Sequence, residues 1–138
     1  MSVPITIEIY IEAPIEKIWQ AWTDPSHITQ WAFASDDWCC PHAENNLFAG
    51  GSFATRMESK DTHEGFDFSG VYTAVEEYKH IAYTIEGGRK VTIDFIPKDS
   101  GFLVVESFDP EDENPIDMQK YGWQCILDNF KKHVESEI

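Results

Sequence analysis

The sequence predicts an α+β fold in which a curved, six-stranded antiparallel sheet wraps around one long C-terminal helix, with two short helices after the first strand. Three observations support this prediction. Residues 3–12 alternate between apolar and polar side chains, which is typical of a half-buried strand. Further strand-like segments joined by short turns follow between residues 53 and 108. The end of the chain carries apolar residues at helical spacing over about 20 residues.

The chain has 138 residues, a length that favours one domain, residues 1–138, with one core. After the first strand, Pro14 suits the first turn of a helix, where its missing N–H needs no partner. Asp24 can then cap a second short helix that Pro25 opens and that continues through Ile28 and Trp31. Two short helices are therefore expected between the first strand and the rest of the sheet.

The middle of the chain predicts an antiparallel meander. Its expected strands cover residues 53–58, 66–74, 81–85, 91–95 and 102–108. The pair Gly87-Gly88 is typical of a two-residue hairpin turn, and the turns KDTHEG and PKDSG join other strands of the meander. The first strand would then pair most simply at the far edge of the meander.

The C-terminal segment predicts the longest helix. Asn114 is expected to cap it and Pro115 to occupy its first turn. Its apolar stripe consists of Trp123, Ile126, Leu127, Phe130 and Val134. Gly122 lies inside this helix, where glycine costs about 1 kcal/mol relative to alanine. Either a strand packs closely against Gly122, or the glycine leaves space for a ligand.

The composition excludes several classes of function. The net charge is −15 and the isoelectric point is about 4.5, so phosphate backbones and anionic lipid surfaces repel the chain. We therefore expect neither nucleic-acid nor membrane binding. No run of about 18 apolar residues is present, and the N-terminus lacks the pattern of a signal peptide. Three cysteines do not make a disulfide framework, and a reducing cytoplasm is the expected location.

The stretch DDWCCPH, residues 36–42, concentrates groups that could bind a metal or react with oxidants. Structural zinc sites space their cysteines by two to four residues and need a second pair elsewhere, whereas Cys39 and Cys40 are adjacent. Asp36 and Asp37 oppose any activation of these thiols by His42. We expect residues 33–50 to form a loop over a pocket, with Trp38 at the pocket mouth and both cysteines reduced and free of metal.

Four segments carry a family resemblance: IEAPIEKIWQAWTDPSHITQWA near the start, AGGSFATRM, FSGVYTAVEEYKHIAYT, and GWQCILDNFKKHVE near the end. In this order and spacing, the chain resembles the START-like (SRPBCC) superfamily, which has a helix-grip fold. Within the superfamily it is similar to the family named for activators of the heat-shock protein 90 ATPase. The resemblance covers nearly the whole chain.

The resemblance implies a pocket, because members of the superfamily bind lipids, steroids, polyketides or plant hormones. We therefore expect a protein that binds a small apolar or amphipathic ligand, as a monomer or homodimer and without a cofactor. The alternative is a co-chaperone-like interaction module with a chaperone partner. No nucleophile motif, paired catalytic carboxylates or phosphate-binding glycine loop is present, so the sequence gives no positive indication of an enzyme.

Candidate pocket residues come from aromatic positions on successive strands and from one flank of the long helix. The expected ligand-binding set is Trp31, Phe33, Trp38, Phe53, Met57, Phe68, Tyr72, Tyr83, Phe95, Met118, Gly122 and Trp123. A completely filled core is the alternative for the same residues. Arg56, Asp67 and Glu106 also lie within predicted strands, and we expect all three to be exposed. An inward-facing charge among them would be a candidate for recognition or acid–base chemistry.

Overall fold

The computed structural model describes residues 3–136 of the chain. Seven strands and three α-helices make up its regular structure, with one short 3₁₀ turn. In chain order they are β1 (Ile5–Ile11), α1 (Ile15–Thr23), α2 (Pro25–Ile28), β2 (Trp38–Asn45), β3 (Ser52–Ser59), β4 (Gly65–Glu76), β5 (His80–Ile85), the turn Glu86–Gly88, β6 (Arg89–Lys98), β7 (Gly101–Phe108) and α3 (Ile116–Ser136). The predicted α+β class is confirmed.

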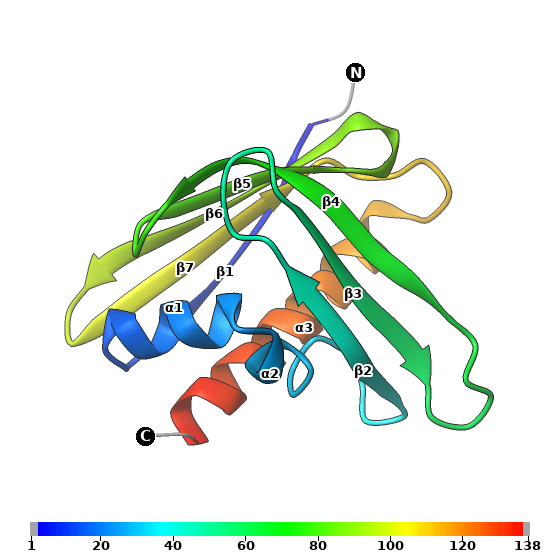
Figure 1. The fold of residues 1–138 in the computed structure, drawn as a ribbon, viewed down its shortest axis with the longest axis horizontal. Helices are drawn as coiled ribbons and strands as arrows, with labels where there is room; N and C mark the ends of the chain where they lie inside the picture. Colours follow the sequence, from blue (N-terminus) through cyan, green and yellow to red (C-terminus); the bar gives the residue numbers. More distant parts are fainter. Residues whose placement is uncertain (1–2, 137–138) are drawn as a thin grey trace.

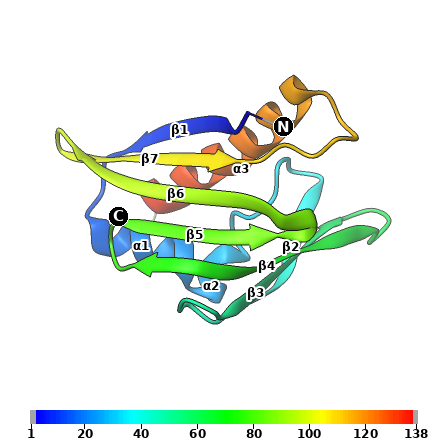
Figure 2. The same ribbon diagram turned by 90° about the horizontal axis from the view of Figure 1, so that it is seen from above.

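All seven strands belong to one antiparallel sheet, in the spatial order β1-β7-β6-β5-β4-β3-β2. The strands from β2 to β7 form a meander, and β1 pairs with β7 at its far edge as expected. The sheet curls, and all three helices lie on its concave side (Figure 1). Seen from above, the strands form a twisted layer that covers the helices (Figure 2).

The strand β2 corrects the sequence analysis, which placed a loop at residues 33–50 and counted six strands. β2 pairs with β3 as an edge strand, and its register shifts between Cys39 and His42. Pro41 lies within this irregularity, where a residue without an N–H is tolerated because edge strands and bulges leave donors unused. The sequence of β2 does not alternate, and alternation is the signal by which a strand is predicted.

The two short helices form where they were predicted. The Asp24 carboxylate accepts hydrogen bonds from the backbone N–H and the hydroxyl of Ser26, at 2.9 and 2.8 Å, and Pro25 is the first residue of α2. These hydrogen bonds lower the pKa of Asp24. Trp19 on α1 is buried against Phe95 of β6, with ring centroids 5.5 Å apart. α1 thus closes one end of the concave face with packed side chains.

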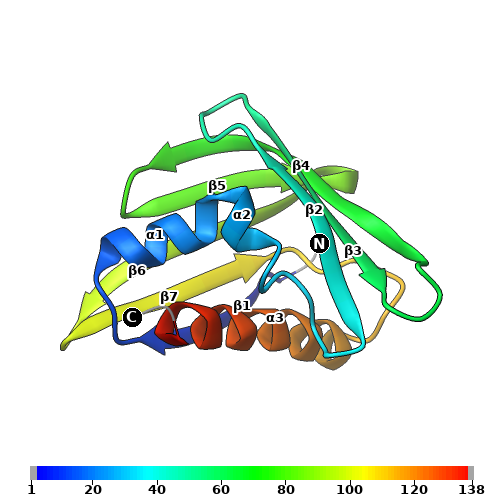
Figure 3. The same cartoon turned by 60° about the horizontal axis from the view of Figure 1, so that its bottom comes forward.

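The long helix α3 crosses the concave face and packs against β1 (Figure 3). Leu127, Phe130 and Val134 are its fully buried apolar residues. Gly122 is half-buried, and a Cβ added there would meet no atom within 4 Å outside the backbone of the helix itself. The expected close approach of a strand at Gly122 is therefore wrong.

Candidate functional site

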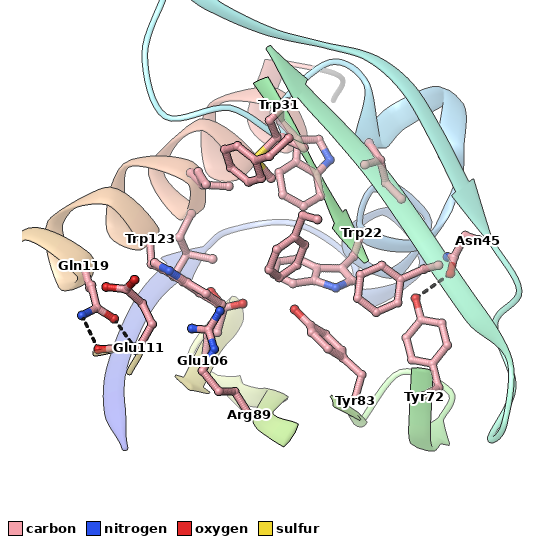
Figure 4. A pocket seen from close by; sticks show the side chains of 18 of the residues that line it. Trp22, Trp31, Asn45, Tyr72, Tyr83, Arg89, Glu106, Glu111, Gln119 and Trp123 are labelled. Carbon is pink, nitrogen blue, oxygen red and sulfur yellow. Dashed lines mark hydrogen bonds between the residues drawn. The ribbon is translucent and has the colours of Figure 1, made fainter. Parts of the chain in front are cut away.

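A cavity of about 370 Å³ lies between the concave face of the sheet and α3. It is framed by the ends of α1 and α2, the strands β2 to β7, the segment before α3, and α3 itself (Figure 4). Its lining consists of Trp22, Ile28, Trp31, Ala32, Glu44, Asn45, Phe53, Met57, Phe66, Phe68, Tyr72, Tyr83, Arg89, Glu106, Glu111, Asn114, Gln119, Trp123, Ile126 and Leu127. The volume falls in the range of about 300–1,000 Å³ that is typical of sites for small molecules.

Aromatic rings form a continuous wall along one side of the cavity. The Phe53 ring on β3 lies with its centroid 4.7 Å from that of Tyr83 and 5.2 Å from that of Tyr72. Phe68 on β4 meets Trp123 of α3 edge to face, at 5.7 Å. These offset and edge-to-face arrangements are the favoured ones for aromatic pairs, so the wall is held in a defined shape.

Glu106 on β7 places a carboxyl group on this otherwise apolar inner face. It aligns with Ile7 on β1 and Ile93 on β6, and Ile93 aligns with Ile81 on β5. These three isoleucines are almost completely buried, and Glu106 itself is only 6% exposed. Burial raises the pKa of Glu106 to about 8 from its ordinary 4.5. The carboxyl group is therefore mostly protonated at neutral pH.

Tyr83 on β5 brings a second polar group to the same cavity. It is 7% exposed, and burial is the main cause that raises the pKa of its hydroxyl well above the ordinary value, with the nearby Glu106 adding to the shift. Figure 4 shows the Tyr83 hydroxyl and Glu106 pointing into the cavity from two different strands. Tyr83 on β5 lies directly opposite Tyr72 on β4 in the sheet.

Neither the Glu106 carboxyl nor the Tyr83 hydroxyl has a hydrogen-bond partner among residues 3–136, whereas the Tyr72 hydroxyl donates to the Asn45 side-chain oxygen at 2.5 Å. Within the same residues, every side-chain nitrogen or oxygen that is inaccessible to solvent has a hydrogen-bond partner. The free oxygens of Glu106 and Tyr83 must therefore open on the cavity. Groups of this kind are available to a bound molecule.

A hydrogen-bonded segment that precedes α3 lines the cavity beside the first turns of the helix. The Gln119 side chain donates to the backbone carbonyls of Glu111 and Asn114, at 3.0 and 2.8 Å, and accepts from the backbone N–H of Glu111 at 2.9 Å. Gln119 is buried, so these bonds hold residues 111–114 firmly against the first turns of the helix. Arg89 on β6 also reaches the cavity here, and it donates to the carbonyl of Asp109 at 3.5 Å.

Seven of the twelve expected pocket residues line the cavity: Trp31, Phe53, Met57, Phe68, Tyr72, Tyr83 and Trp123. Their place in the lining is a fact of the structure, and their contact with a ligand stays a prediction. The other five lie outside the lining. Phe95 packs against Trp19 and Trp22 in the filled core under α1, because those two indoles occupy the space at that end of the sheet.

On α3, the expected flank was wrong by about one residue. Met118 is 60% exposed and Gly122 does not line the cavity, whereas Gln119 and Trp123 do. Successive helical residues are about 100° apart, so a shift of one position moves a side chain from the cavity to its flank. The buried residues near the C-terminal end of α3, such as Phe130, fix this rotation.

Phe33 and Trp38 lie next to the cavity without lining it. Phe33 is half-buried in the segment after α2, where its carbonyl accepts a hydrogen bond from the Asn129 side chain at 2.7 Å. The Trp38 ring tilts against Phe66, which does line the cavity, at a centroid distance of 6.3 Å. Trp38 begins an edge strand rather than a loop, and its contact with the cavity is indirect, through Phe66.

Of the three charged residues that were expected to be exposed, Arg56 and Asp67 lie at the surface and Glu106 does not. The Asp67 side chain is 67% exposed, and Arg56 lies 3.7 Å from it and 3.8 Å from Glu58 at the surface of β3 and β4. Glu106 is buried, so the expectation was wrong for this residue. Glu106 alternates in step with Val104 and Phe108, so the sequence already placed it on the same face of β7 as these two apolar residues. Leu103 and Val105 make the opposite face of β7 equally apolar, which left the inner face undecided.

Within the stretch DDWCCPH, residues 38–42 form the first part of β2. Cys39 is half-buried and Cys40 is buried, and both are free thiols. Burial raises the pKa of Cys40 to about 11. Across residues 3–136, no three histidine, cysteine or acidic side chains are grouped so that they could hold a metal ion. In the same part of the chain, no helix is long and apolar enough to cross a membrane.

Comparison with known proteins agrees with this architecture. A curled antiparallel sheet that grips a long C-terminal helix defines the helix-grip class of START-like proteins, to which the fold belongs. Residues 12–135 match the family described as activator of Hsp90 ATPase homolog 1-like protein, and the chain belongs to this family. The family name describes an activity of other members. No protein of the curated collection matches the chain.

Solved structures give the same assignment. An AHSA1-like protein from Aeromonas hydrophila is 41% identical over 98% of this chain and 94% of its own, with a TM-score of 0.92. A protein from Cytophaga hutchinsonii is 47% identical over 96% of this chain and 92% of its own, with a TM-score of 0.82. A protein from Chromobacterium violaceum, 22% identical with a TM-score of 0.84 over 94% of this chain and 96% of its own, shares the fold.

Proposed function

We propose that this protein binds a small amphipathic molecule in the cavity between the sheet and α3. The observation that carries the proposal is the buried Glu106 carboxyl, which opens on a cavity of about 370 Å³ without a partner among the described residues. An isoleucine or valine would fit the row between Ile7 and Ile93 and stabilise the fold, so a carboxyl there works against stability. Residues that lower stability in a cavity are typical of functional sites.

The lining supports a ligand with an apolar body. The rings of Phe53, Phe68, Tyr72 and Trp123 offer a wide apolar wall, and polar side chains reach the cavity on both sides of it, with Asn45 on one side and Glu111 and Gln119 on the other (Figure 4). Sites for small molecules generally combine a mostly apolar lining with a few polar groups that orient the ligand. The cavity volume lies at the lower end of the usual range, so the ligand is small.

Native mass spectrometry of the gently purified protein tests this proposal, together with a thermal-shift screen of small aromatic and amphipathic compounds. The variant Ile126→Trp puts an indole into the cavity from α3, whereas Met118→Trp adds the same indole on the exposed flank of the same helix. We expect a bound mass or a ligand-induced shift in melting temperature for the wild type and Met118→Trp, and its loss in Ile126→Trp.

Intrinsic fluorescence provides an independent readout, because Trp22, Trp31 and Trp123 line the cavity. A ligand that enters should change their emission. Absence of any bound mass, thermal shift and fluorescence change in the wild type would reject the proposal. Equal binding by Ile126→Trp would place the binding site elsewhere and reject it as well.

A further inference from the structure

We infer that the ligand of this cavity is an organic amine, whose apolar body lies among the aromatic rings and whose protonated nitrogen is held by Glu106 and Tyr83. This inference rests on the proposed function and adds the chemical class of the ligand. Three observations carry it: the unpartnered acidic pair, the ring wall beside that pair, and the balance of charge at the cavity.

The first observation concerns Glu106 and Tyr83. Both are more than nine-tenths buried, both open on the cavity, and neither has a hydrogen-bond partner among the described residues. A carboxylate accepts hydrogen bonds only, and a phenol oxygen accepts as well as donates. An ammonium group brings up to three donors and a positive charge, so it satisfies both oxygens at once. A neutral alcohol would leave the carboxyl group in its uncharged form.

The second observation is the position of the aromatic wall. The Tyr83 ring belongs to it, and the Phe53 ring follows at a centroid distance of 4.7 Å. Aromatic rings attract a cation that lies close to their faces, most strongly where water is excluded. An apolar chain or ring attached to the nitrogen would then extend toward Phe68 and Trp123, whose rings lie 5.7 Å apart.

The third observation is the charge around the cavity. Three carboxyl groups line it, from Glu44 on β2, Glu106 on β7 and Glu111 before α3, against one cation, Arg89 on β6. Arg89 donates to the carbonyls of Glu86 and Asp109 at the edge, and no ion pair between it and Glu106 is found in residues 3–136. The whole chain carries −15, which raises the local concentration of cations and disfavours anionic ligands.

Three ligands with the same aromatic body test the inference: 3-phenylpropylamine, 3-phenylpropanol and 3-phenylpropanoate. Isothermal titration calorimetry at pH 7 measures each of them against the full chain. We expect the amine to bind at least about tenfold more tightly than the alcohol, because a hydrogen bond between two charged groups is stronger than one to a neutral hydroxyl. The carboxylate should bind most weakly, because it brings a second acidic group next to Glu106. The variant Glu106→Gln should remove the preference for the amine, so that amine and alcohol bind with similar affinity.

The matched control is Glu44→Gln, which removes the same charge from the exposed rim of the cavity, where the side chain is 67% exposed. It should keep most of the preference for the amine.

Other titratable or charged groups also face the cavity, and both variants leave them in place: Tyr72 on β4, Tyr83 on β5, Arg89 on β6 and Glu111 before α3. A preference that arises from overall negative charge would fall equally in both variants, and that result would overturn the assignment to Glu106.

Proton release distinguishes an amine site from a site for neutral acceptors. When an ammonium group pairs with Glu106, the carboxyl group loses its proton to the buffer. The number of protons released is measured by repeating the titration in buffers of different ionisation enthalpy. We expect close to one proton released per amine bound at pH 7. Glu106→Gln should release none. Tight amine binding without proton release in the wild type would contradict pairing with Glu106.

The outcomes also separate this inference from the proposed function. Binding of the alcohol or the carboxylate as tightly as the amine overturns the amine assignment and leaves the cavity a binding site. Failure of all three, with binding of other compounds in the thermal-shift screen, overturns it in the same way. Failure of all three together with an empty screen and no bound mass rejects both proposals.

Discussion

The indole of Trp123 on α3 stacks on the ring of Phe108 on β7, with centroids 3.8 Å apart and planes inclined by 8°. Phe108 is completely buried and lies two residues from Glu106 on the same face of β7. The stack therefore fixes the helix on the sheet beside the buried carboxyl group. It also makes Trp123 both a part of the core and a wall of the cavity.

Removing this stack should destabilise the fold. We expect Trp123→Ala to lower the free energy of unfolding by about 2–4 kcal/mol, because a half-buried large ring loses both its contacts and its buried area. The matched control is Trp38→Ala, another half-buried tryptophan whose ring contacts Phe66 only at 6.3 Å, on an edge strand. Urea unfolding of both variants provides the comparison, and equal losses would show that the stack adds nothing.

The buried carboxyl of Glu106 should make stability depend on pH. Burial raises its pKa to about 8, whereas the unfolded chain has the ordinary 4.5. Between these values the folded chain holds a proton that the unfolded chain has released, so stability falls as pH rises, by up to about 1.4 kcal/mol per pH unit. Below 4.5 both states are protonated, and above about 8 both are ionised, so the effect of Glu106 is constant there.

The variant Glu106→Gln isolates this effect. Its free energy of unfolding should lie close to the wild-type value at pH 5 and exceed it at pH 9, by a difference on the order of 3–5 kcal/mol. Glu44→Gln serves as the control, because its carboxylate is exposed at the rim of the cavity. Urea unfolding at a series of pH values gives the curves. Parallel curves for the wild type and Glu106→Gln would exclude a strongly shifted pKa in the folded state.

Replacing Gly122 should stabilise the protein. An alanine side chain there meets no atom within 4 Å outside the helix backbone, and alanine is favoured over glycine inside a helix by about 0.5–1 kcal/mol. Gly101→Ala is the contrasting variant, because an added Cβ would come within 2.2 Å of the Ile11 carbonyl oxygen. Thermal unfolding should show a higher melting temperature for the first and a clear decrease for the second. A loss of stability in Gly122→Ala would reveal a constraint on α3 that packing does not explain.

The two adjacent cysteines should react at different rates. Burial raises the pKa of Cys40 to about 11, and only the thiolate attacks an alkylating reagent. We expect iodoacetamide at pH 8 to modify Cys40 at least about tenfold more slowly than the half-buried Cys39, as measured by mass spectrometry of timed digests. Cys125, which is also half-buried, is the internal reference. Equal rates at Cys39 and Cys40 would show that β2 opens faster than the reaction.

The elements with a clear period could be predicted from the sequence. The alternation in β1 and the three- and four-residue spacing in α3 each identify an element and its buried face. The strand β2 lacks alternation and contains Pro41, so its own sequence does not indicate a strand. Its extended conformation depends on pairing with β3. Local patterns thus predicted the layers of the fold but missed the irregular strand.

The site was harder to predict, because its parts depend on how faces are oriented. Both faces of β7 are apolar, so pairing with β1 and the stack of Phe108 on Trp123 of α3 decide that Glu106 points inward. On α3, a rotation of about one residue separates Gln119 from Met118. That rotation depends on contacts with distant strands and leaves no mark in the helix sequence.

The edge position of β2 has a consequence for the behaviour of the protein at high concentration. An exposed edge strand is a template on which another chain can add its own strand. Pro41 lacks a donor, and the shifted register between Cys39 and His42 interrupts the row of backbone groups along β2. At the opposite edge, β1 packs against α3. The open sheet thereby carries its own protection against strand-by-strand aggregation, and the cysteine-rich stretch is part of that protection.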